Sequence, residues 1–236
     1  MLKDLLTIVI PCKNEKEVVK KTLNLINKQD GIKDVNVIVA DCSNDYGITK
    51  KYINSEKNKN ININIIKGGL PALGRNVGAK LCKTKYILFL DADIFLEKKD
   101  IIINVVNEIE SKNFSLLTCK IRVDSNKKYN IAYFLFDLIR KAIKIKASFA
   151  LGGFMLFNLS DFNKVGRFNE LDKFAEDFHL SSKINHKKFR ISKEKVYTTP
   201  RRFENKGILY MAKVMCMTWL YKNNDEFYKK EHKYWS

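Results

Sequence analysis

Strand-like and helix-like patterns alternate along the first half of the chain. Strand patterns, mostly unbroken apolar runs, lie at residues 7–10, 35–40, 61–65 and 86–90. Apolar residues at helical spacing between them predict helices at residues 15–29, 47–54 and 71–83. Such alternation predicts an α/β fold: a mostly parallel sheet flanked by helices.

The second half of the chain is less regular. It predicts a strand over residues 115–123, a basic amphipathic helix or loop–helix over 130–146, and an apolar segment at 154–158. Helices are expected after a cap at residues 160–161, over 176–185, and as one longer terminal helix over 203–221. Because no repeat or low-complexity linker interrupts the chain, we expect one domain spanning residues 1–236.

Composition narrows the functional classes. Of 236 residues, 45% are hydrophobic, which excludes global disorder. The net charge of +18 favours an anionic partner, which could be a nucleic acid, a phosphorylated small molecule or an acidic lipid surface. Five cysteines without C-x-x-C spacing indicate reduced thiols and a cytoplasmic location. The longest uncharged stretch, residues 147–160, is too short to span a membrane, so we expect a soluble or surface-bound protein.

Acidic residues follow two of the predicted strands. Asp41 ends the second strand, and Asp91 and Asp93 follow the fourth. Each alone could simply cap a turn. Open parallel sheets, however, bind ligands beyond the carboxyl ends of their strands. Two carboxylates two residues apart repel each other unless a cation separates them, and Mg²⁺ or Mn²⁺ with a substrate diphosphate suits them.

Six motifs follow one another along the chain: TIVIPCKNE at residues 7–15, VIVADCSND at 37–45, GLPALGRNVG at 69–78, YILFLDAD at 86–93, GG through GRFNE at 152–170, and AEDFHL at 175–180. With these motifs in this order, the sequence resembles the family-2 nucleotide-sugar glycosyltransferases of the GT-A fold. Two departures are evident, because Ala40 leaves Asp41 as a single acid and no third metal ligand clearly follows Asp93. The resemblance extends from about residue 5 to residue 200.

The resemblance implies a function and a set of roles. The reaction would be an inverting transfer of a sugar from a nucleoside-diphosphate sugar, with a UDP-sugar favoured, to an acceptor hydroxyl on a sugar, glycan or glycolipid. Asp177 would be the general base, Asp93 would bind Mn²⁺ or Mg²⁺ directly, and Asp91 would hold the ribose or assist the metal. The nucleotide sugar would contact Pro11, Asn14, Glu15, Asp41, Arg75, Asp91, Ala92 and Arg202.

The same resemblance divides the domain into parts. Residues from about 1 to 120 would bind the nucleotide sugar, residues from about 121 to 200 would face the acceptor, and residues from about 201 to 236 would form a helical extension. His179 is either an ordinary helix residue, which we favour, or a third metal ligand. Arg202 is the better candidate of the 201–202 pair to grip the diphosphate.

Two alternatives compete with this function. A sugar-phosphate nucleotidyltransferase would need a glycine-rich phosphate loop after the first strand, and residues 11–15 contain no glycine. A basic nucleic-acid-binding protein would explain the charge, but no recognition helix, zinc spacing or RNP-like strand supports it, and we expect no nucleic acid partner.

Two segments suggest where the protein works. Residues 120–146 carry eight basic residues against two acids, interleaved with aromatic and aliphatic side chains, and residues 208–221 are rich in methionine and aromatic residues. Either both pack on the sheet with solvated lysines, or they lie in a lipid interface. The second interpretation predicts a peripheral protein at the cytoplasmic membrane face, acting on a lipid-linked acceptor.

Overall fold

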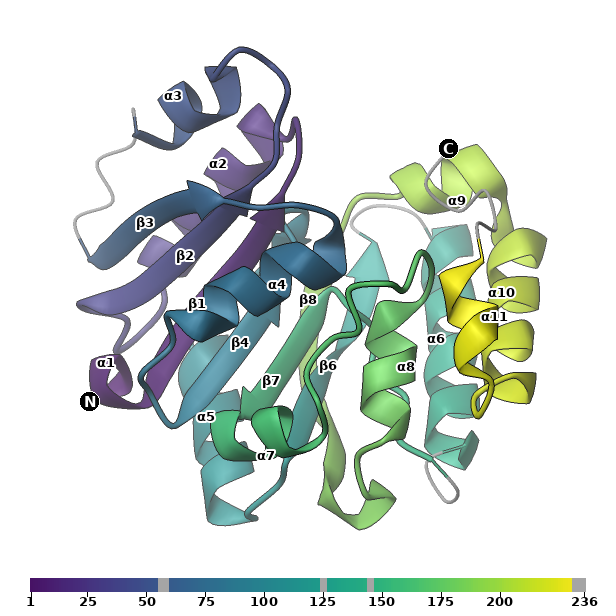
Figure 1. Ribbon diagram of the computed structural model, residues 1–236. Helices are drawn as coiled ribbons and strands as arrows, with labels where there is room; N and C mark the ends of the chain where they lie inside the picture. Colours follow the sequence, from purple (N-terminus) through teal and green to yellow (C-terminus); the bar gives the residue numbers. More distant parts are fainter. Residues whose placement is uncertain (55–59, 124–126, 144–146, 231–236) are drawn as a thin grey trace.

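The protein, examined as a computed structural model, is built on one eight-stranded sheet (Figure 1). The structure describes residues 1–54, 60–123, 127–143 and 147–230. The strands are β1 (Leu6–Cys12), β2 (Val35–Asp41), β3 (Ile61–Lys67), β4 (Tyr86–Leu90), β5 (Ile94–Phe95), β6 (Leu116–Val123), β7 (Phe154–Asn158) and β8 (Phe189–Thr198). Their order across the sheet is β3-β2-β1-β4-β7-β6-β8-β5.

The sheet is mixed but mostly parallel, as predicted. β3, β2, β1 and β4 are parallel neighbours, and β6 pairs with β8 in parallel. β7 runs antiparallel to both β4 and β6, and β5 is antiparallel to β8. β7 therefore joins β1–β4 to β6 and β8 within one sheet.

Helices cover both faces of the sheet and its β6–β8 end (Figure 1). They are α1 (Leu2–Leu5), α2 (Lys16–Asn27), α3 (Ile48–Asn54), α4 (Pro71–Lys80), α5 (Ile101–Ser111), α6 (Lys127–Ile143), α7 (Leu159–Lys164), α8 (Glu176–Ser182), a 3₁₀ turn (His186–Lys188), α9 (Arg201–Lys206), α10 (Ile208–Leu220) and α11 (Asp225–Lys229).

Alternation along the buried strands divides the core into two layers. Ile8 and Ile10 of β1 face the layer that holds α2 and α5, whereas Val9 faces the layer of α4, α7 and α8. Successive side chains of a strand point to opposite faces, so a continuous apolar run is what a strand covered on both sides requires. A third cluster, beside the sheet, packs α6, α9, α10 and α11 around Phe136, Phe203 and Phe227.

Several sequence expectations need correction. Pro11 does not end the first strand, which continues to Cys12. Although proline has no N–H to donate, Pro11 still pairs in register with Ala40 of β2. The cap of α7 is Asn158 and not residues 160–161, since the Asn158 side chain accepts from the backbone amides of Ser160 and Asp161.

The expected single terminal helix is in fact two. Gly207, with φ of +80°, separates α9 from α10, and a positive φ is a backbone conformation that glycine adopts without a Cβ penalty. The predicted basic helix is α6, which begins earlier and ends at Ile143. Residues 124, 144 and 146 of that basic segment lie outside the described residues.

Candidate active site

Arg75 lies at the centre of the candidate site. α4 carries it into the interior, where Nη2 binds Asp91 Oδ1 at 2.7 Å and Nη1 binds Glu176 Oε1 at 2.5 Å. Burial disfavours the guanidinium charge, but Asp91, Glu176 and Asp177 outweigh burial and raise the pKa of Arg75. Arg75 thus ties the end of β4 to the start of α8 and remains charged.

Asp93 is a partly compensated acid of the site. Thr199 Oγ1 lies 3.4 Å from Asp93 Oδ2, and the Arg201 guanidinium is 3.8 Å away. Burial, with the negative charges of Asp91 and Glu15, outweighs the opposing charges of Arg202 and Arg201 and raises the pKa of Asp93 to about 6. Because protein cations satisfy this carboxylate only in part, the site favours an additional cation beside it.

The donor set fits a divalent metal that a substrate helps to hold. Glu15 Oε2 is buried without a hydrogen-bond partner among the described residues, while Glu15 Oε1 accepts from Arg201 at 2.8 Å. No group of three or more His, Cys, Asp or Glu in the described ranges is placed to hold a metal by itself. Mg²⁺ and Mn²⁺ need no such cage, because one or two carboxylates with substrate phosphates complete their coordination. Asp93, aided by Asp91, is the residue of this chain that would hold the ion.

Asp177 is oriented by backbone amides. Gly152 N donates to its Oδ2 at 2.6 Å, and Phe178 N donates to its Oδ1 at 2.8 Å. A Cβ at position 152 would lie 3.0 Å from Asp177 Oδ2 and 3.1 Å from Arg75 Nη2, so glycine allows this close approach. Ala175 precedes the helix with φ of +49°, a strained conformation for a residue with a side chain.

These acids border one cavity of about 130 Å³. Its polar end contains Arg75, Asp91, Asp93, Glu176, Asp177, Thr199 and Arg202. Its apolar lining comes partly from α6, α9 and α10 and partly from β5, β6, α8 and the segment before Gly152. The catalytic and metal-binding acids predicted from the sequence therefore lie around one space.

The remaining predicted residues lie at the neighbouring strand ends. Asp41 Oδ1 accepts from Ser43 N at 2.9 Å and from Ser43 Oγ at 2.5 Å. Asn14, with φ of +54°, donates from its backbone N to the same Ser43 Oγ at 2.7 Å. The turns after β1 and β2 are thus held together. Pro11, in β1, pairs in register with Ala40 of β2 beside them.

Ala92 has a backbone role in the structure. It is buried, and its carbonyl accepts from Thr22 Oγ1 of α2 at 2.6 Å. This contact anchors the segment between Asp91 and Asp93 to the helix layer. Pro11, Asn14, Glu15, Asp41 and Ala92 do not border the cavity, and their contacts with a nucleotide stay a prediction.

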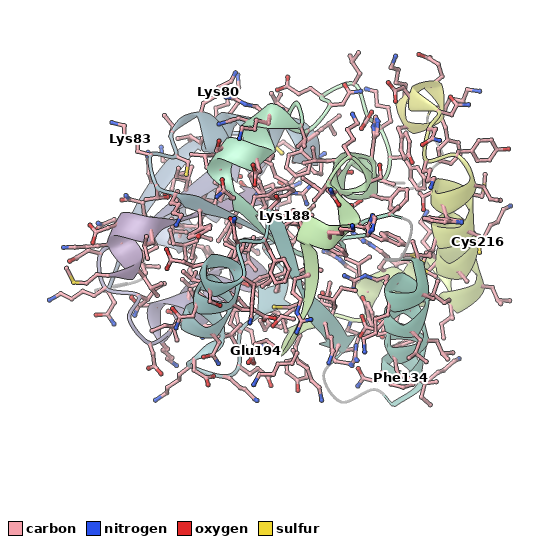
Figure 2. All side chains as sticks on the ribbon, turned by 90° about the horizontal axis from the view of Figure 1, so that it is seen from below. Lys80, Lys83, Phe134, Lys188, Glu194 and Cys216 are labelled. Atoms are coloured by element: carbon pink, nitrogen blue, oxygen red, sulfur yellow. The ribbon has the colours of Figure 1, made fainter. Side chains whose placement is uncertain are left out.

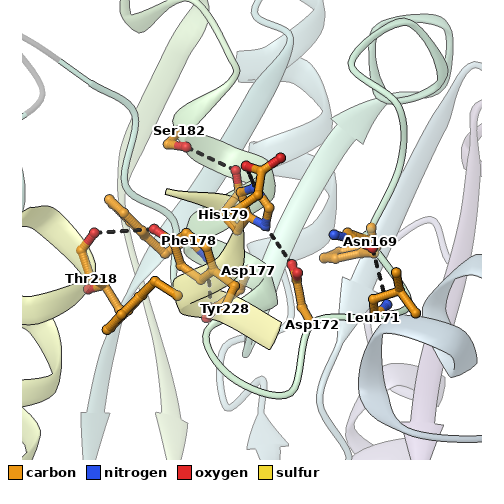
Figure 3. Close-up of polar contacts among 12 residues, drawn as sticks. Asn169, Leu171, Asp172, Asp177, Phe178, His179, Ser182, Thr218 and Tyr228 are labelled. Atoms are coloured by element: carbon orange, nitrogen blue, oxygen red, sulfur yellow. Dashed lines mark hydrogen bonds and ion pairs between the residues drawn. The ribbon is translucent and has the colours of Figure 1, made fainter. Parts of the chain in front are cut away.

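His179 is held in a cluster beside the site (Figure 3). Its Nδ1 lies 2.6 Å from Asp172 Oδ2, its Nε2 lies 3.1 Å from Asp225 Oδ1, and its ring stacks on Tyr228 with centroids 4.2 Å apart. Since both ring nitrogens face carboxylates, the geometry favours the first sequence interpretation: His179 fastens α11 to α8, the helix that bears Asp177.

Sequence reasoning missed two contributors. Glu176 was part of a motif, but its ion pair with Arg75 depends on a tertiary contact across 101 positions of sequence. Thr199 follows β8, a strand that was not predicted although residues 189–198 alternate between buried and exposed positions along much of its length. That alternation was the available indication.

Comparisons with known proteins agree with this architecture. The family described as "Glycosyl transferase family 2" matches residues 7–166, more than half of the chain. No curated protein matches the sequence significantly. TarS of S. aureus is 21% identical with a TM-score of 0.63, over 93% of this chain and 40% of the TarS chain.

Two ligand complexes are also similar in structure. Residues 1–349 of TarS in complex with UDP-GlcNAc match at 21% identity and a TM-score of 0.60, over 83% of this chain and 58% of that one. The mannosyltransferase PcManGT from Pyrobaculum calidifontis, in complex with GDP-Man and Mn²⁺, matches at 17% identity and a TM-score of 0.66, over 89% of this chain and 64% of the PcManGT chain.

At these sequence identities the similarity shows the fold alone, which is that of GT-A enzymes. The chain spans about 40% to 64% of the length of the three matched chains. The family match rests on the sequence itself and includes both acids after β4 and the Gly152 turn. The chain therefore belongs to glycosyl transferase family 2.

Proposed function

We propose that this chain transfers a sugar from a nucleoside-diphosphate sugar to an acceptor hydroxyl, with inversion at the anomeric carbon. One observation carries the proposal: Asp93, a carboxylate that lacks a full complement of cations, and Asp177, a carboxylate aimed by two amides, border the same cavity. The first suits a metal–diphosphate group, and the second suits a proton acceptor.

The residues divide the reaction between them. Asp177 takes the proton of the acceptor hydroxyl while the oxygen attacks the anomeric carbon. The bond from that carbon to the diphosphate oxygen breaks on the opposite face, and the diphosphate leaves with the electron pair, which inverts the configuration. A Mn²⁺ or Mg²⁺ ion bound at Asp93 supplies Lewis-acid stabilisation of the leaving diphosphate. Arg202, at the edge of the cavity, is placed to contact its oxygens.

Donor recognition is assigned to the strand ends beside the cavity. Asp41 is an acceptor-only group when ionised and suits the imide N–H of uracil, so we favour a UDP-sugar. TarS in complex with UDP-GlcNAc and PcManGT in complex with GDP-Man show that proteins of this fold bind either base. We place donor binding in residues from about 1 to 120, acceptor binding in about 121 to 200, and a helical extension in 201–236, all within one domain.

A membrane-facing position is supported by α6. Five side chains at helical spacing on its outer side, Ile131, Phe134, Leu135, Leu138 and Ile139, are each more than 40% exposed. Lys128 and Lys141 are exposed on the same helix, whereas its single acid, Asp137, is buried between Arg122 and Arg140. An apolar stripe with cations and no exposed acid suits the interface of an anionic membrane.

The described helices include none that is long and apolar enough to cross a membrane, so attachment would be peripheral. The five cysteines are free, which supports the reducing cytoplasmic side. We expect co-sedimentation with anionic but not neutral vesicles, weakened by salt. Absence of binding to either vesicle at low salt would contradict this placement.

Activity is tested with a panel of UDP- and GDP-sugars and Mn²⁺. The expected result is a thermal upshift and slow donor hydrolysis with one sugar nucleotide, both of which disappear on chelation. Donor binding that is indifferent to metal, or no binding of any nucleotide sugar, would contradict the proposal. Steep salt-dependent binding of oligonucleotides without nucleotide-sugar binding would instead support the nucleic-acid alternative.

A further inference from the structure

The cavity beside Asp177 is lined by apolar as well as acidic side chains. Its apolar lining includes Phe136 of α6, Phe178 of α8, Phe203 of α9, and Met211, Val214 and Met215 of α10. Tyr133 of α6 adds an aromatic ring, and its hydroxyl lies within the electrostatic influence of Arg202 and Asp93. Tyr133 and Phe136 pack on Phe203 with ring centroids 4.9 and 6.2 Å apart. The aromatic rings give this end a fixed shape, and the methionine side chains can adapt to a ligand.

These walls offer few groups to a hydroxylated ligand. α10 contributes a polar side chain to the cavity lining, that of Thr218, and its hydroxyl already donates to Met215 O at 2.9 Å. A buried sugar hydroxyl without a partner is strongly disfavoured. The apolar end therefore suits hydrocarbon, whereas the acids at the other end suit a polar head.

The helices that line the cavity also form the outer apolar surface. α6 turns Tyr133 and Phe136 inward, while its opposite side carries Phe134 and Leu138, and Figure 2 shows Phe134 projecting from this outer side. α10 contains no acid, and Leu209 and Leu220 near its ends are 87% and 75% exposed. Only the thickness of these helices therefore separates a lipid bound at this outer surface from the cavity.

We propose that the apolar end of the cavity binds the hydrocarbon chain of a lipid-linked acceptor, with the acceptor hydroxyl at Asp177. The placement of the hydroxyl rests on the proposed function, whereas binding of the chain rests on the cavity walls alone. The acceptor class is thus an amphiphile: a hydroxyl-bearing head joined to an alkyl or isoprenoid chain.

The test uses butyl, hexyl and octyl β-D-glucosides below their micellar concentrations as probes. Calorimetric affinity should rise roughly fourfold with each buried methylene, and glucose itself should bind weakly or not at all. Met211→Trp, which fills the cavity, should lower octyl glucoside affinity at least tenfold. Leu209→Trp places the same side chain at an exposed position of the same helix and should leave the affinity unchanged.

The outcomes separate this inference from the proposed function. Affinity that does not increase with chain length, or an equal loss in Met211→Trp and Leu209→Trp, overturns the chain site. The circular dichroism spectrum and melting temperature check that each variant is folded, and Mn²⁺-dependent nucleotide binding is measured on the same samples. If nucleotide binding holds and chain binding fails, the chain site alone is wrong; if the reverse is found, the proposed function is wrong and the chain site stands.

A second measurement places the head. Octyl glucoside bound as proposed covers Asp177 and should slow the hydrolysis of the donor by water in proportion to its occupancy. Saturating octyl glucoside that leaves hydrolysis unchanged would contradict the position of the hydroxyl at Asp177.

Discussion

Replacing Asp93 with asparagine should make the metal-free protein more stable while removing its response to metal and nucleotide. Folding raises the pKa of Asp93 from 3.8 to about 6, chiefly by burial and then by the charges of Asp91 and Glu15. The folded state therefore disfavours the ionised form, and above pH 6 this group destabilises the protein. Asp93→Asn removes that charge at nearly constant shape.

The magnitude follows from the pKa difference. A rise from 3.8 to about 6 corresponds to about 3 kcal/mol at neutral pH, as an upper value. For a chain of this size the melting temperature should rise by up to roughly 6–12 °C. As pH falls from 6 toward 3.8, the wild-type carboxyl becomes protonated and the difference between variant and wild type should shrink to nearly zero.

The assay is urea denaturation of the metal-free protein at several pH values between about 3 and 8. Asp45→Asn is the control of opposite sign, because hydrogen bonds from Thr49 lower the pKa of Asp45. That variant should be less stable than wild type at neutral pH, and its deficit should fade as pH falls below about 4. Equal or lower stability of metal-free Asp93→Asn at pH 7.5 would refute the claim that the ionised Asp93 carboxylate is incompletely neutralised in the metal-free protein.

Three further substitutions test the site. Asp177→Asn should retain donor binding and lower turnover by roughly 10²–10⁴-fold in steady-state kinetics, and near-normal turnover would exclude Asp177 as the base. Arg75→Met should cost about 3–5 kcal/mol in denaturation, because the buried Glu176 and the partly exposed Asp91 lose their buried partner. Replacing the half-exposed Arg190 with Met should cost under about 1 kcal/mol. His179→Phe should destabilise the fold by about 3 kcal/mol, because it leaves the buried carboxylate of Asp172 without its partner. The loss should exceed that of Asp225→Asn, whose side chain is exposed, and Mn²⁺-dependent nucleotide affinity should be retained. Loss of that affinity alone, with stability unchanged, would make His179 a metal ligand instead.

Local patterns were sufficient to predict the first half of the sheet. β1, β2 and β4 are buried on both faces and therefore read as apolar runs, and the acids that follow them could be placed at one edge of the sheet. The metal-binding and general-base candidates needed the family motifs as well, because an acid after a strand or at a helix start has an equally good structural role.

The second half depended on contacts that a local pattern does not contain. α5 was not predicted, although Ile101, Val105 and Ile109 are buried at helical spacing. The break at Gly207 was missed, although the change from the mostly charged residues 201–206 to the apolar run that starts at Ile208 was an available indication. The cavity walls were interpreted as packing or as membrane surface, since only the tertiary arrangement shows which side of α6 faces Asp177.

The most direct test of the central claim is a calorimetric titration of the wild-type protein with UDP and GDP, with and without Mn²⁺, repeated on Asp93→Asn. We predict tight binding of one nucleotide, with UDP favoured, only when Mn²⁺ is present, and its loss in Asp93→Asn although that variant is folded and stable. Binding of equal strength without Mn²⁺, or undiminished Mn²⁺-dependent binding in Asp93→Asn, would contradict the assignment of this cavity as a metal-assisted nucleotide-sugar site.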